Sequence, residues 1–318
     1  MKAPSFWQSH NLWSKLLSPF AKNYGAVVQH KLRRATGHRS RLPVICVGNV
    51  TMGGSGKTPV VDAIATILKE QGQHPAILMR GYGGKAKGPL WVTPEIPAEV
   101  CGDEALLHAR IAPTLVSRNR AIGAQEIEKI PELTHIVMDD GLQNPSLQKT
   151  KSIIVLDGKN PLGNGRIFPS GPLRETLENA LHRVQALIIL GEDRLHIGTQ
   201  YQFLLPVFHS AIQPLNGADF NGKPVIAFAG IGNPAKFFQS LKDSDAVIIK
   251  SYEFADHYFY DKKEIQKMID EAQRINAKLV TTRKDWVRIY PEQQKQIAVL
   301  DVAVKFQDKQ AVRDFLLS

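Results

Sequence analysis

The stretch PVICVGNVTMGGSGKTP, residues 43–59, joins an apolar run, a glycine-rich turn and a Gly-Lys-Thr triplet. The β-branched and apolar residues from Val44 to Val47 predict a buried strand. Glycines in the turn let backbone N–H groups converge on phosphate oxygens. Lys57 is placed to reach the β- and γ-phosphates of a nucleotide, and Thr58 offers a hydroxyl to Mg²⁺. The residues predicted to surround the nucleotide are Thr51, Met52, Gly53, Gly54, Ser55, Gly56, Lys57 and Thr58.

The segment after the turn predicts a helix over 58–71, with Pro59 in its first turn. The positive end of the helix dipole then faces the phosphates. Thr51 departs from the general P-loop pattern, because it occupies the position of the first glycine. A glycine-rich loop without a catalytic role is the alternative interpretation, and the order of strand, loop and helix argues against it.

The composition is that of an ordinary globular protein, and a length of 318 residues suggests about two domains. No run of about 18 apolar residues occurs, so we expect no transmembrane helix. The two cysteines, Cys46 and Cys101, give neither a disulfide framework nor a metal-ligand spacing. This cysteine usage favours a reducing cytosol.

Positive charge is concentrated at the N-terminus. The net charge is +10, and residues 1–41 contain eight Lys or Arg but no Asp or Glu. Pro19 and Gly25 are expected to kink or divide a helix there. A basic amphipathic helix with aromatic residues predicts binding to an anionic membrane surface. The apolar residues at helical spacing are Trp13, Leu16, Leu17, Phe20, Tyr24, Val27 and Val28.

Residues 1–40 have other interpretations. They could form a helix packed on the first domain with a solvated basic face, or a mitochondrial transit peptide, which is also rich in Arg and poor in acids. The transit peptide is disfavoured because the charged helix runs almost directly into the first strand. We expect no nucleic-acid binding, since no recognition module accompanies the charge. Nothing in the sequence identifies a protein partner.

Strand and helix patterns alternate along the chain, which predicts an α/β fold of the P-loop NTPase type: a mostly parallel sheet with flanking helices, plus a second, smaller α/β domain. The predicted domains are the N-terminal segment 1–40, a P-loop domain over 41–215 and the smaller domain over 216–318. Strands are expected over 44–47, 75–80, 113–117, 134–141, 152–157, 184–190, 224–229, 245–252, 277–282 and 296–304, with 201–215 extended. Helices are expected over 58–71, 103–112, 118–129, 233–242, 261–274 and at the C-terminus.

Two carboxylates follow the strand predicted from THIVMDDG, residues 134–141. Asp139 and Asp140 would lie at its carboxyl end, where ligands bind in open α/β sheets. A P-loop needs such a carboxylate to fix Mg²⁺. The alternative for Asp140 is a turn formed with the following glycine.

Three other segments have ordinary structural explanations. Asp103 could be the N-cap of the helix after it, with Glu104 favouring the helix dipole. His257, in FADHYFYD, could be a packed or exposed side chain of a surface loop. Lys284 and Asp285 are expected to be surface charges. Spacing alone does not connect His257 with Asp103.

The chain resembles the tetraacyldisaccharide 4′-kinases of lipid A assembly over nearly its whole length. That family's loop also lacks the first glycine, which accounts for Thr51. Asn144 departs from the His expected after DDGLQ, which leaves its role open. Met52 argues against partition and positioning ATPases, which carry a Lys there. The resemblance rests on VGNVTMGGSGKTP (47–59), RGYGG (80–84), GDE (102–104), SRNR (117–120), DDGLQ (139–143), GPLRE (171–175), FAGIGNP (228–234), FADHY (254–258) and TTRKD (281–285).

The resemblance implies transfer of the γ-phosphoryl group of ATP to the 4′-hydroxyl of an acylated glucosamine disaccharide 1-phosphate, in lipid A (lipopolysaccharide) biosynthesis. It implies a peripheral enzyme at the cytoplasmic face of the bacterial inner membrane, with ATP and Mg²⁺ as cofactors. Asp103 is then the general base, oriented by His257, with Lys57 as the third catalytic residue. The other implied assignments are Arg120 and Arg174 at the phosphates, Thr58, Asp139, Asp140 and Glu175 at Mg²⁺, and Arg80, Tyr82 and Gln143 at the substrate.

Two other classes stay open on the residues alone. A regulatory switch or insertion factor would use the P-loop for a conformational output, but no guanine-reading Asn-Lys-x-Asp motif is present. A membrane-tethered scaffold with a degenerate nucleotide site conflicts with the intact pair of Lys57 and Thr58.

Overall fold

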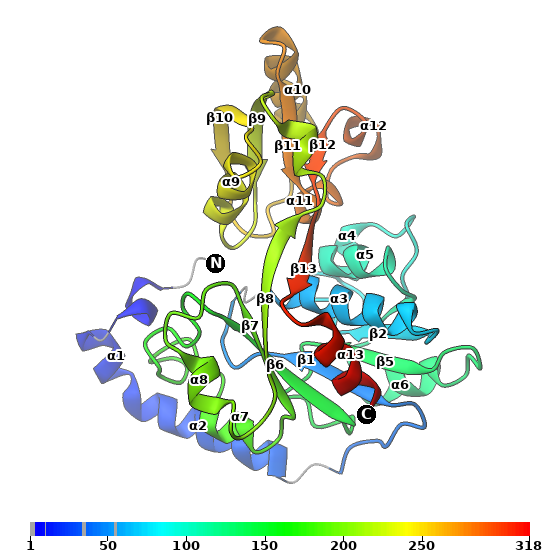
Figure 1. Ribbon diagram of the computed structural model, residues 1–318, viewed down its shortest axis with the longest axis vertical. Helices are drawn as coiled ribbons and strands as arrows, with labels where there is room; N and C mark the ends of the chain where they lie inside the picture. Colours follow the sequence, from blue (N-terminus) through cyan, green and yellow to red (C-terminus); the bar gives the residue numbers. More distant parts are fainter. Residues whose placement is uncertain (1–3, 10, 34–35, 54–55) are drawn as a thin grey trace.

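The computed structural model describes residues 4–9, 11–33, 36–53 and 56–318. Within these residues the chain forms a sheet of nine strands and, above it in Figure 1, a sheet of four. The larger sheet contains, in spatial order, β13 (Val302–Phe306), β8 (Val207–Pro214), β7 (Ala186–Leu190), β6 (Lys151–Asp157), β1 (Val44–Gly48), β5 (His135–Asp139), β2 (Pro75–Met79), β4 (Thr114–Val116) and β3 (Leu90–Trp91). The α/β fold with a mostly parallel sheet is confirmed.

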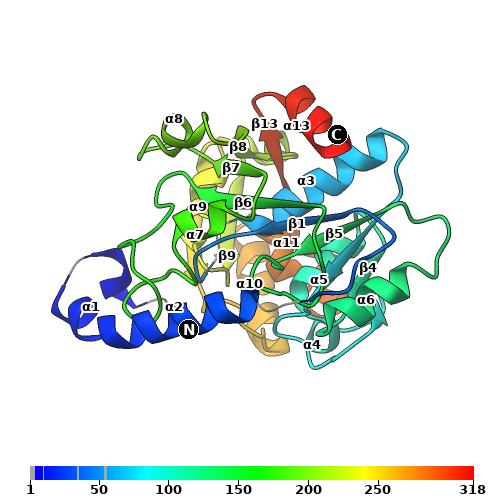
Figure 2. The same cartoon turned by 90° about the horizontal axis from the view of Figure 1, so that it is seen from below.

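Helices cover both faces of the larger sheet, as the nearly unbroken apolar strands predict. On β1, Ile45 and Val47 belong to the core beneath α3 and α13, while Val44 and Cys46 belong to the core beneath α6. Figure 2 shows α3 and α13 on one side of the sheet and α6 on the other. The helices of this part are α3 (Lys57–Glu70), α4 (Ala98–Cys101), α5 (Asp103–Ala109), α6 (Arg120–Ile127), α7 (Leu177–Leu181), α8 (Ile197–Tyr201) and α13 (Lys309–Leu317).

The strand register places the P-loop beside the two aspartates. β1 and β5 are parallel neighbours, with Val47 opposite Asp139. The carboxyl ends of both strands therefore lie at the same edge of the sheet, where open α/β sheets bind ligands. The strand expected over 134–141 is confirmed as His135–Asp139.

The smaller sheet is parallel between all paired strands. Its strand order is β10 (Val247–Glu253), β9 (Pro224–Ala229), β11 (Lys278–Thr282) and β12 (Ala298–Leu300). Phe228 of β9 packs beneath α10 (Lys262–Arg274), and Ala227 packs beneath α9 (Pro234–Lys242) on the opposite face. The remaining elements are the 3₁₀ helix η2 (Gly217–Phe220), α11 (Arg283–Trp286) and α12 (Pro291–Gln294).

The single strand expected over 296–304 is wrong, because this segment forms two strands in two different sheets. β12 pairs with β11 in the smaller sheet, whereas β13 pairs antiparallel with β8 in the larger one. Where the chain passes from β12 to β13, the Asn216 side chain binds the backbone. Its Oδ1 accepts from Asp301 N–H at 2.9 Å, and its Nδ2 donates to Val299 C=O at 2.9 Å.

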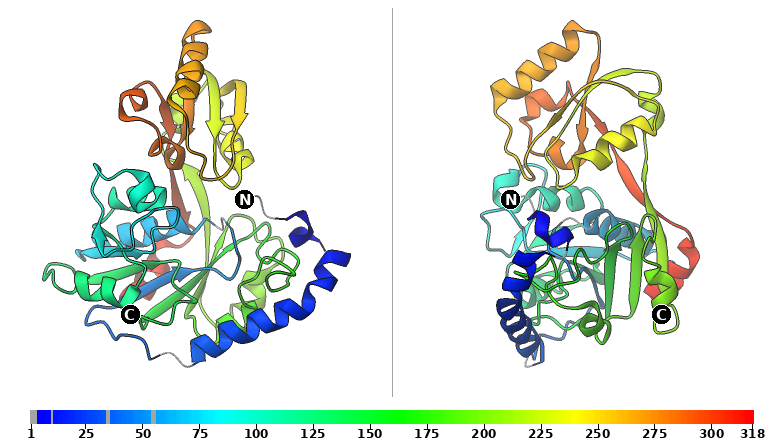
Figure 3. Two further views of the ribbon diagram at one scale, coloured as in Figure 1. Left: turned by 180° about the vertical axis from the view of Figure 1, so that it is seen from behind. Right: turned by 90° about the vertical axis from the view of Figure 1, so that its left-hand side faces the viewer.

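Residues 302–317, expected in the smaller domain, consequently lie with the larger sheet. β8 and β13 form the connection between the two sheets, which Figures 1 and 3 show as two long neighbouring strands. We call the part built on the larger sheet the large unit and the part built on the smaller sheet the small unit.

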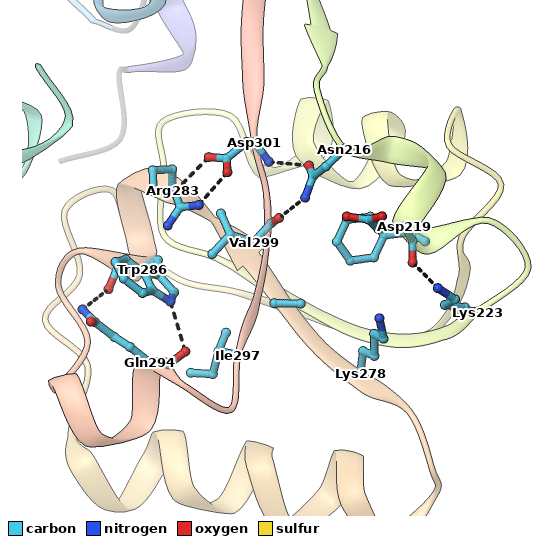
Figure 4. A pocket seen from close by; sticks show the side chains of 12 residues that line it. Asn216, Asp219, Lys223, Lys278, Arg283, Trp286, Gln294, Ile297, Val299 and Asp301 are labelled. Atoms are coloured by element: carbon cyan, nitrogen blue, oxygen red, sulfur yellow. Dashed lines mark hydrogen bonds and ion pairs between the residues drawn. The ribbon is translucent and has the colours of Figure 1, made fainter. Parts of the chain in front are cut away.

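A pocket of about 400 Å³ opens in the small unit next to this crossing (Figure 4). At its rim the Arg283 guanidinium donates from Nε to Oδ1 of Asp301 at 2.8 Å. Lys223 and Lys278 also line it. Within the described part of the chain, none of the predicted site residues lines this pocket, so it is separate from the P-loop.

The N-terminal segment forms the 3₁₀ helix η1 (Ser5–Gln8), α1 (Leu12–Leu16) and α2 (Ser18–Arg33). The break between α1 and α2 falls before Pro19, which sits in the first turn of α2, where Pro is tolerated. Gly25 does not divide α2; a Cβ there would lie 3.1 Å from Ile167 Cδ1. No helix among the described residues is long and apolar enough to cross a membrane.

Candidate active site

The P-loop has the expected connection from β1 to α3, although α3 begins at Lys57 rather than at 58. Gly56 is the N-cap, with φ of 77°, and a Cβ at this position would lie 2.3 Å from Leu190 Cδ2. Only glycine fits this turn without strain. Upstream, Met52 N–H donates to Pro172 C=O at 2.7 Å, and Thr51 Oγ1 accepts from Asn49 Nδ2 at 3.0 Å. The predictions for Gly54 and Ser55 lie outside the described residues.

Asp140 is held by two cations at the edge of the larger sheet. Arg174 binds it bidentately, at 2.8 and 3.0 Å, and Lys57 Nζ lies 3.9 Å from its Oδ1. Burial disfavours the charged carboxylate, but Lys57 and Arg174 outweigh burial and hold the pKa of Asp140 below its ordinary value. Arg174 is itself anchored by a backbone bond from its N–H to Val50 C=O at 2.7 Å. Positive charge is thereby gathered beside the P-loop.

Asp139 has a different environment. It is 4% exposed, and its Oδ1 has no hydrogen-bond partner among the described residues. Its Oδ2 lies 3.4 Å from Nε2 of the fully buried His108, whose Nδ1 lies 2.5 Å from Asp62 Oδ1. Burial opposes the charged imidazole, but the two carboxylates outweigh it and raise the pKa of His108 to about 10. The sequence reasoning missed His108 and Asp62.

The residues around the P-loop fit a nucleotide-bound Mg²⁺. Within the described part of the chain, no group of three or more His, Cys, Asp or Glu forms a metal cage. Mg²⁺ at such sites takes few protein ligands and completes its shell with phosphate and water oxygens. The buried Oδ1 of Asp139, which has no partner in the part of the chain that the structure describes, and the Thr58 hydroxyl match that requirement.

Glu175 and Gln143 lie in a buried network next to Arg174. Arg183 Nη2 donates to both oxygens of Glu175 at 2.8 Å, and Gln143 Nε2 donates to Oε1 at 3.0 Å. Arg174 Nη1 in turn donates to Gln143 Oε1 at 3.2 Å. Glu175 is 1% exposed. The structure thus places Glu175 against Arg183 and Gln143, and Gln143 and Arg174 connect it to Asp140.

The two remaining basic residues of the sequence predictions differ in exposure. Arg120 is buried, and its Nη1 donates to Ser117 C=O at 2.5 Å. Burial lowers its pKa to about 10, against the opposing effect of Asp139 and Asp140. Arg80 is exposed at the end of β2.

Tyr82 is exposed, and its ring centroid lies 5.6 Å from that of His257. Asn144, whose role the sequence left open, forms a local turn: its Oδ1 accepts from Ser146 N–H at 2.9 Å.

Asp103 meets His257 where the two units contact. Nδ1 of His257 lies 2.9 Å from Asp103 Oδ2, and Arg288 Nε lies 3.6 Å from the same oxygen. Burial disfavours the Asp103 carboxylate, but His257, Lys284 and Arg288 outweigh burial, so its pKa lies below the ordinary value. The N-cap of α5 is Gly102, so Asp103 is the first helical residue rather than the cap.

Lys284 and Glu104 form a second contact between the units. Lys284 Nζ lies 3.2 Å from Glu104 Oε1, and that oxygen also accepts from Thr58 Oγ1 at 3.3 Å. The expectation of surface charge at 284–285 is wrong. Lys284 is mostly buried by this contact, and the fully buried Asp285 accepts from Gly230 N–H at 2.9 Å. Linear spacing gave no signal for these pairs, because their partners are distant in sequence.

A P-loop beside two strand-end aspartates, with a buried carboxylate at a contact between units and its neighbour Glu104 bound to the P-loop threonine, is the arrangement of a phosphoryl-transfer enzyme. The fold and site therefore define a P-loop phosphotransferase. Residues 13–318 match the family model described as tetraacyldisaccharide-1-P 4′-kinase. The chain belongs to this family.

Known proteins are similar over nearly the whole chain. A tetraacyldisaccharide 4′-kinase of Rhodospirillum rubrum is 43% identical, over 97% of this chain and 95% of its own length. One from Bradyrhizobium sp. (strain BTAi1) is 41% identical, over 99% and 94% respectively. The crystal structure of LpxK from Aquifex aeolicus in complex with ATP superposes with a TM-score of 0.77 at 26% identity, covering 96% of this chain and 99% of that one.

Proposed function

We propose that this chain transfers the γ-phosphoryl group of ATP to the 4′-hydroxyl of an acylated glucosamine disaccharide 1-phosphate. The observation that carries the proposal is the pair of Asp103 and His257, 2.9 Å apart, at the contact between the units. The pair is connected to the P-loop, because Glu104, the residue after Asp103, binds the Thr58 hydroxyl at 3.3 Å. Family membership and the ATP complex of the Aquifex relative support the reaction and the phosphoryl donor.

Asp103 is the proton acceptor in this proposal. Its low pKa keeps it ionised at neutral pH. A carboxylate of this kind accepts the hydroxyl proton late, when the phosphoryl group has largely been transferred. Its Oδ1 accepts the Glu104 N–H at 2.9 Å and its Oδ2 accepts the His257 Nδ1–H. His257 thereby fixes the orientation of the carboxylate.

Lys57 and Arg174 supply positive charge for the phosphates. Both are oriented by Asp140, which keeps the two cations close together before the nucleotide arrives. Preorganised charge of this kind stabilises the transition state without further rearrangement. Mg²⁺, when bound with ATP, neutralises charge on the β- and γ-phosphates, and Thr58 and Asp139 are the residues we assign to hold it. Glu175, bound by Arg183, accepts a hydrogen bond from Gln143, and Gln143 accepts one from Arg174, so this network fixes the position of Arg174.

The contact between the units completes the site. The large unit supplies Asp103 and Glu104, while the small unit supplies His257, Lys284 and Arg288. Closing these surfaces around the substrates would exclude water, which otherwise competes as the phosphoryl acceptor. β8 and β13 connect the two units, so such a movement would turn about these strands.

The N-terminal helices are proposed to hold the enzyme on the anionic, cytoplasmic surface of the inner membrane, where the acyl chains of the substrate remain in the bilayer. Lys15, Lys22 and Lys31 are exposed along the same helices. On the inner side, Tyr24 packs edge-on against Phe168 at 5.3 Å. An exposed apolar row with flanking lysines matches an interfacial helix. The exposed apolar side chains are Leu12, Trp13, Leu16, Phe20 and Val27.

The test is incubation of the purified protein with ATP, Mg²⁺ and the acylated disaccharide 1-phosphate, with separate measurement of lipid phosphate and ADP. We expect a bisphosphorylated lipid and ADP in equal amounts. Asp103→Asn, which keeps the shape but accepts no proton, should retain ATP binding and lose turnover. ADP release by the wild type without lipid phosphorylation would instead indicate a nucleotide-driven switch and would reject the proposal.

A further inference from the structure

Three side chains, the partly exposed Asp62 and the buried His108 and Asp139, form a connected row next to the P-loop. His108 is fully buried, with Nδ1 2.5 Å from Asp62 Oδ1 and Nε2 3.4 Å from Asp139 Oδ2. Since each ring nitrogen faces a carboxylate oxygen, each donates, and the imidazole is fixed in position and orientation. The roles assigned above to the P-loop, Asp103 and His257 do not use His108 or Asp62.

The positions of these residues follow from two facing helices. On α3, Asp62 comes four residues after Thr58; on α5, His108 comes four residues after Glu104. Residues four apart lie on the same face of a helix. α3 and α5 therefore contact each other through two successive pairs, Thr58 with Glu104 at 3.3 Å and Asp62 with His108 at 2.5 Å. The second pair is one turn further from the P-loop, and its His108 reaches Asp139 of β5.

The contact with His108 gives the two carboxylate oxygens of Asp139 different hydrogen bonding. Oδ2 is bound to the imidazole, while the buried Oδ1 has no partner among the described residues. A carboxylate bound through one oxygen cannot rotate freely, so the other oxygen keeps one direction. Partners of this kind behind a metal ligand fix its geometry and tune its affinity for the metal.

We propose that His108, held by Asp62, is a positioning residue that presents Oδ1 of Asp139 to the Mg²⁺ of bound ATP. The proposal rests on the function proposed above and adds a specific dependence to it. Because His108 and Asp103 stand on the same short helix, the contact also ties the metal-facing carboxylate to the element that carries the proposed base.

The experiment measures ATP affinity of the full chain twice, in EDTA and in saturating Mg²⁺, without any lipid. His108→Leu removes both ring contacts at similar volume, whereas His108→Gln keeps one amide donor toward Asp139. We expect His108→Leu to bind metal-free ATP as the wild type does and to lose about 10- to 100-fold of the Mg²⁺-dependent gain in affinity. His108→Gln should recover most of that gain.

His38→Leu is the matched control, because His38 also pairs with a carboxylate, Glu128, at 3.2 Å, but lies before the amino end of β1. It should leave both ATP affinities unchanged. If His108→Leu does not fold, Asp62→Asn is tested in its place, because Asp62 is partly open to solvent. The asparagine keeps the shape of the side chain but binds the imidazole more weakly. Asp62→Asn should therefore also reduce the Mg²⁺-dependent gain in ATP affinity.

Two results overturn the inference: a wild-type gain from Mg²⁺ in a folded His108→Leu or Asp62→Asn protein, or an equal loss of affinity with and without Mg²⁺, which indicates a purely structural role. Both are independent of the lipid reaction. A wild-type protein that gains ATP affinity from Mg²⁺ through His108 but phosphorylates no lipid would reject the proposed function and retain this inference.

Discussion

The imidazole of His257 donates from Nδ1 to Oδ2 of Asp103 at 2.9 Å, although the two residues are 154 positions apart in the chain. The bond joins the first residue of α5 to a loop of the small unit. His257 holds a left-handed backbone conformation, with φ of 58°, which is strained for a residue other than glycine. The pair therefore depends on how the two units are placed.

His257→Gln should shift the acidic limb of the pH–rate profile to higher pH. In the wild type the pKa of Asp103 lies below its ordinary value of 3.8, so the carboxylate form persists into acid. Without the imidazole, burial is less opposed and the pKa rises, so activity falls at a higher pH. The measurement is kcat/KM against pH, with His182→Gln, a histidine outside the site, as the control. An unmoved acidic limb would contradict the role of His257.

The same linkage predicts an effect on stability. A carboxyl whose pKa is depressed in the folded state stabilises the fold above its unfolded pKa and loses that contribution as the pH falls through the folded value. His257→Gln should therefore lower the unfolding temperature at pH 7 and have little effect in strong acid. Thermal unfolding of both proteins at a series of pH values checks this, and an equal deficit at every pH would speak against it.

Lys284→Met should reduce kcat more than the affinity for ATP. The substitution removes the contact between the units at Glu104, and the partly exposed Glu104 carboxylate, which also accepts from the Thr58 hydroxyl, loses its neighbouring cation. Because this ion pair joins the two units, its loss weakens the contact between them. Steady-state kinetics with direct ATP titration separates the two effects. Lys250→Met, which removes an exposed pair with Glu271 at 2.7 Å on the outer edge of the small unit, is the control.

Gly56→Ala should weaken ATP binding strongly. The added methyl group would lie 2.3 Å from Leu190 Cδ2, and φ of 77° adds backbone strain of about 1–2 kcal/mol. Gly72→Ala is the matched control, because φ there is 72° but no atom among the described residues lies within 4 Å of the new Cβ. Calorimetric titration with ATP should show loss only for Gly56→Ala. Equal affinities in both variants would mean that the turn does not contact the nucleotide.

Replacing Leu16 and Phe20 by Ser should weaken binding to anionic vesicles by roughly tenfold or more, since each exposed apolar side chain gains about 1.5–3 kcal/mol on burial. Phe20 is 64% exposed, so its loss removes little internal packing. Vesicle sedimentation measures the effect. The control is Val247→Ser with Ile249→Ser, which alters exposed apolar residues on β10. ATP affinity should be unchanged in both. Wild-type sedimentation of the helix variant would assign α1 and α2 a structural role.

Much of the architecture follows from short-range pattern. The apolar runs at 44–47 and before Asp139 favour buried strands, and the structure has β1 and β5 there, while glycine permits the left-handed conformation found at Gly56. The parallel order then brings both strand ends to one edge. The same reasoning failed at 296–304, where nothing in the local pattern distinguishes one strand from two, because the change of sheet depends on Asn216, far away in sequence.

Residue types and spacing were sufficient for the class of chemistry: a lysine and a threonine after a glycine turn, and an aspartate after a neighbouring strand. Residue types and spacing did not indicate which side chains contact one another in the folded protein. Packing alone decided whether Asp139 or Asp140 keeps an oxygen without a hydrogen-bond partner among the described residues, whether Lys284 is exposed, and whether His108 contacts Asp139. The physical reason is that a buried charge takes its properties from the groups that folding brings within a few ångströms, and those groups come from helices and units that the linear order separates.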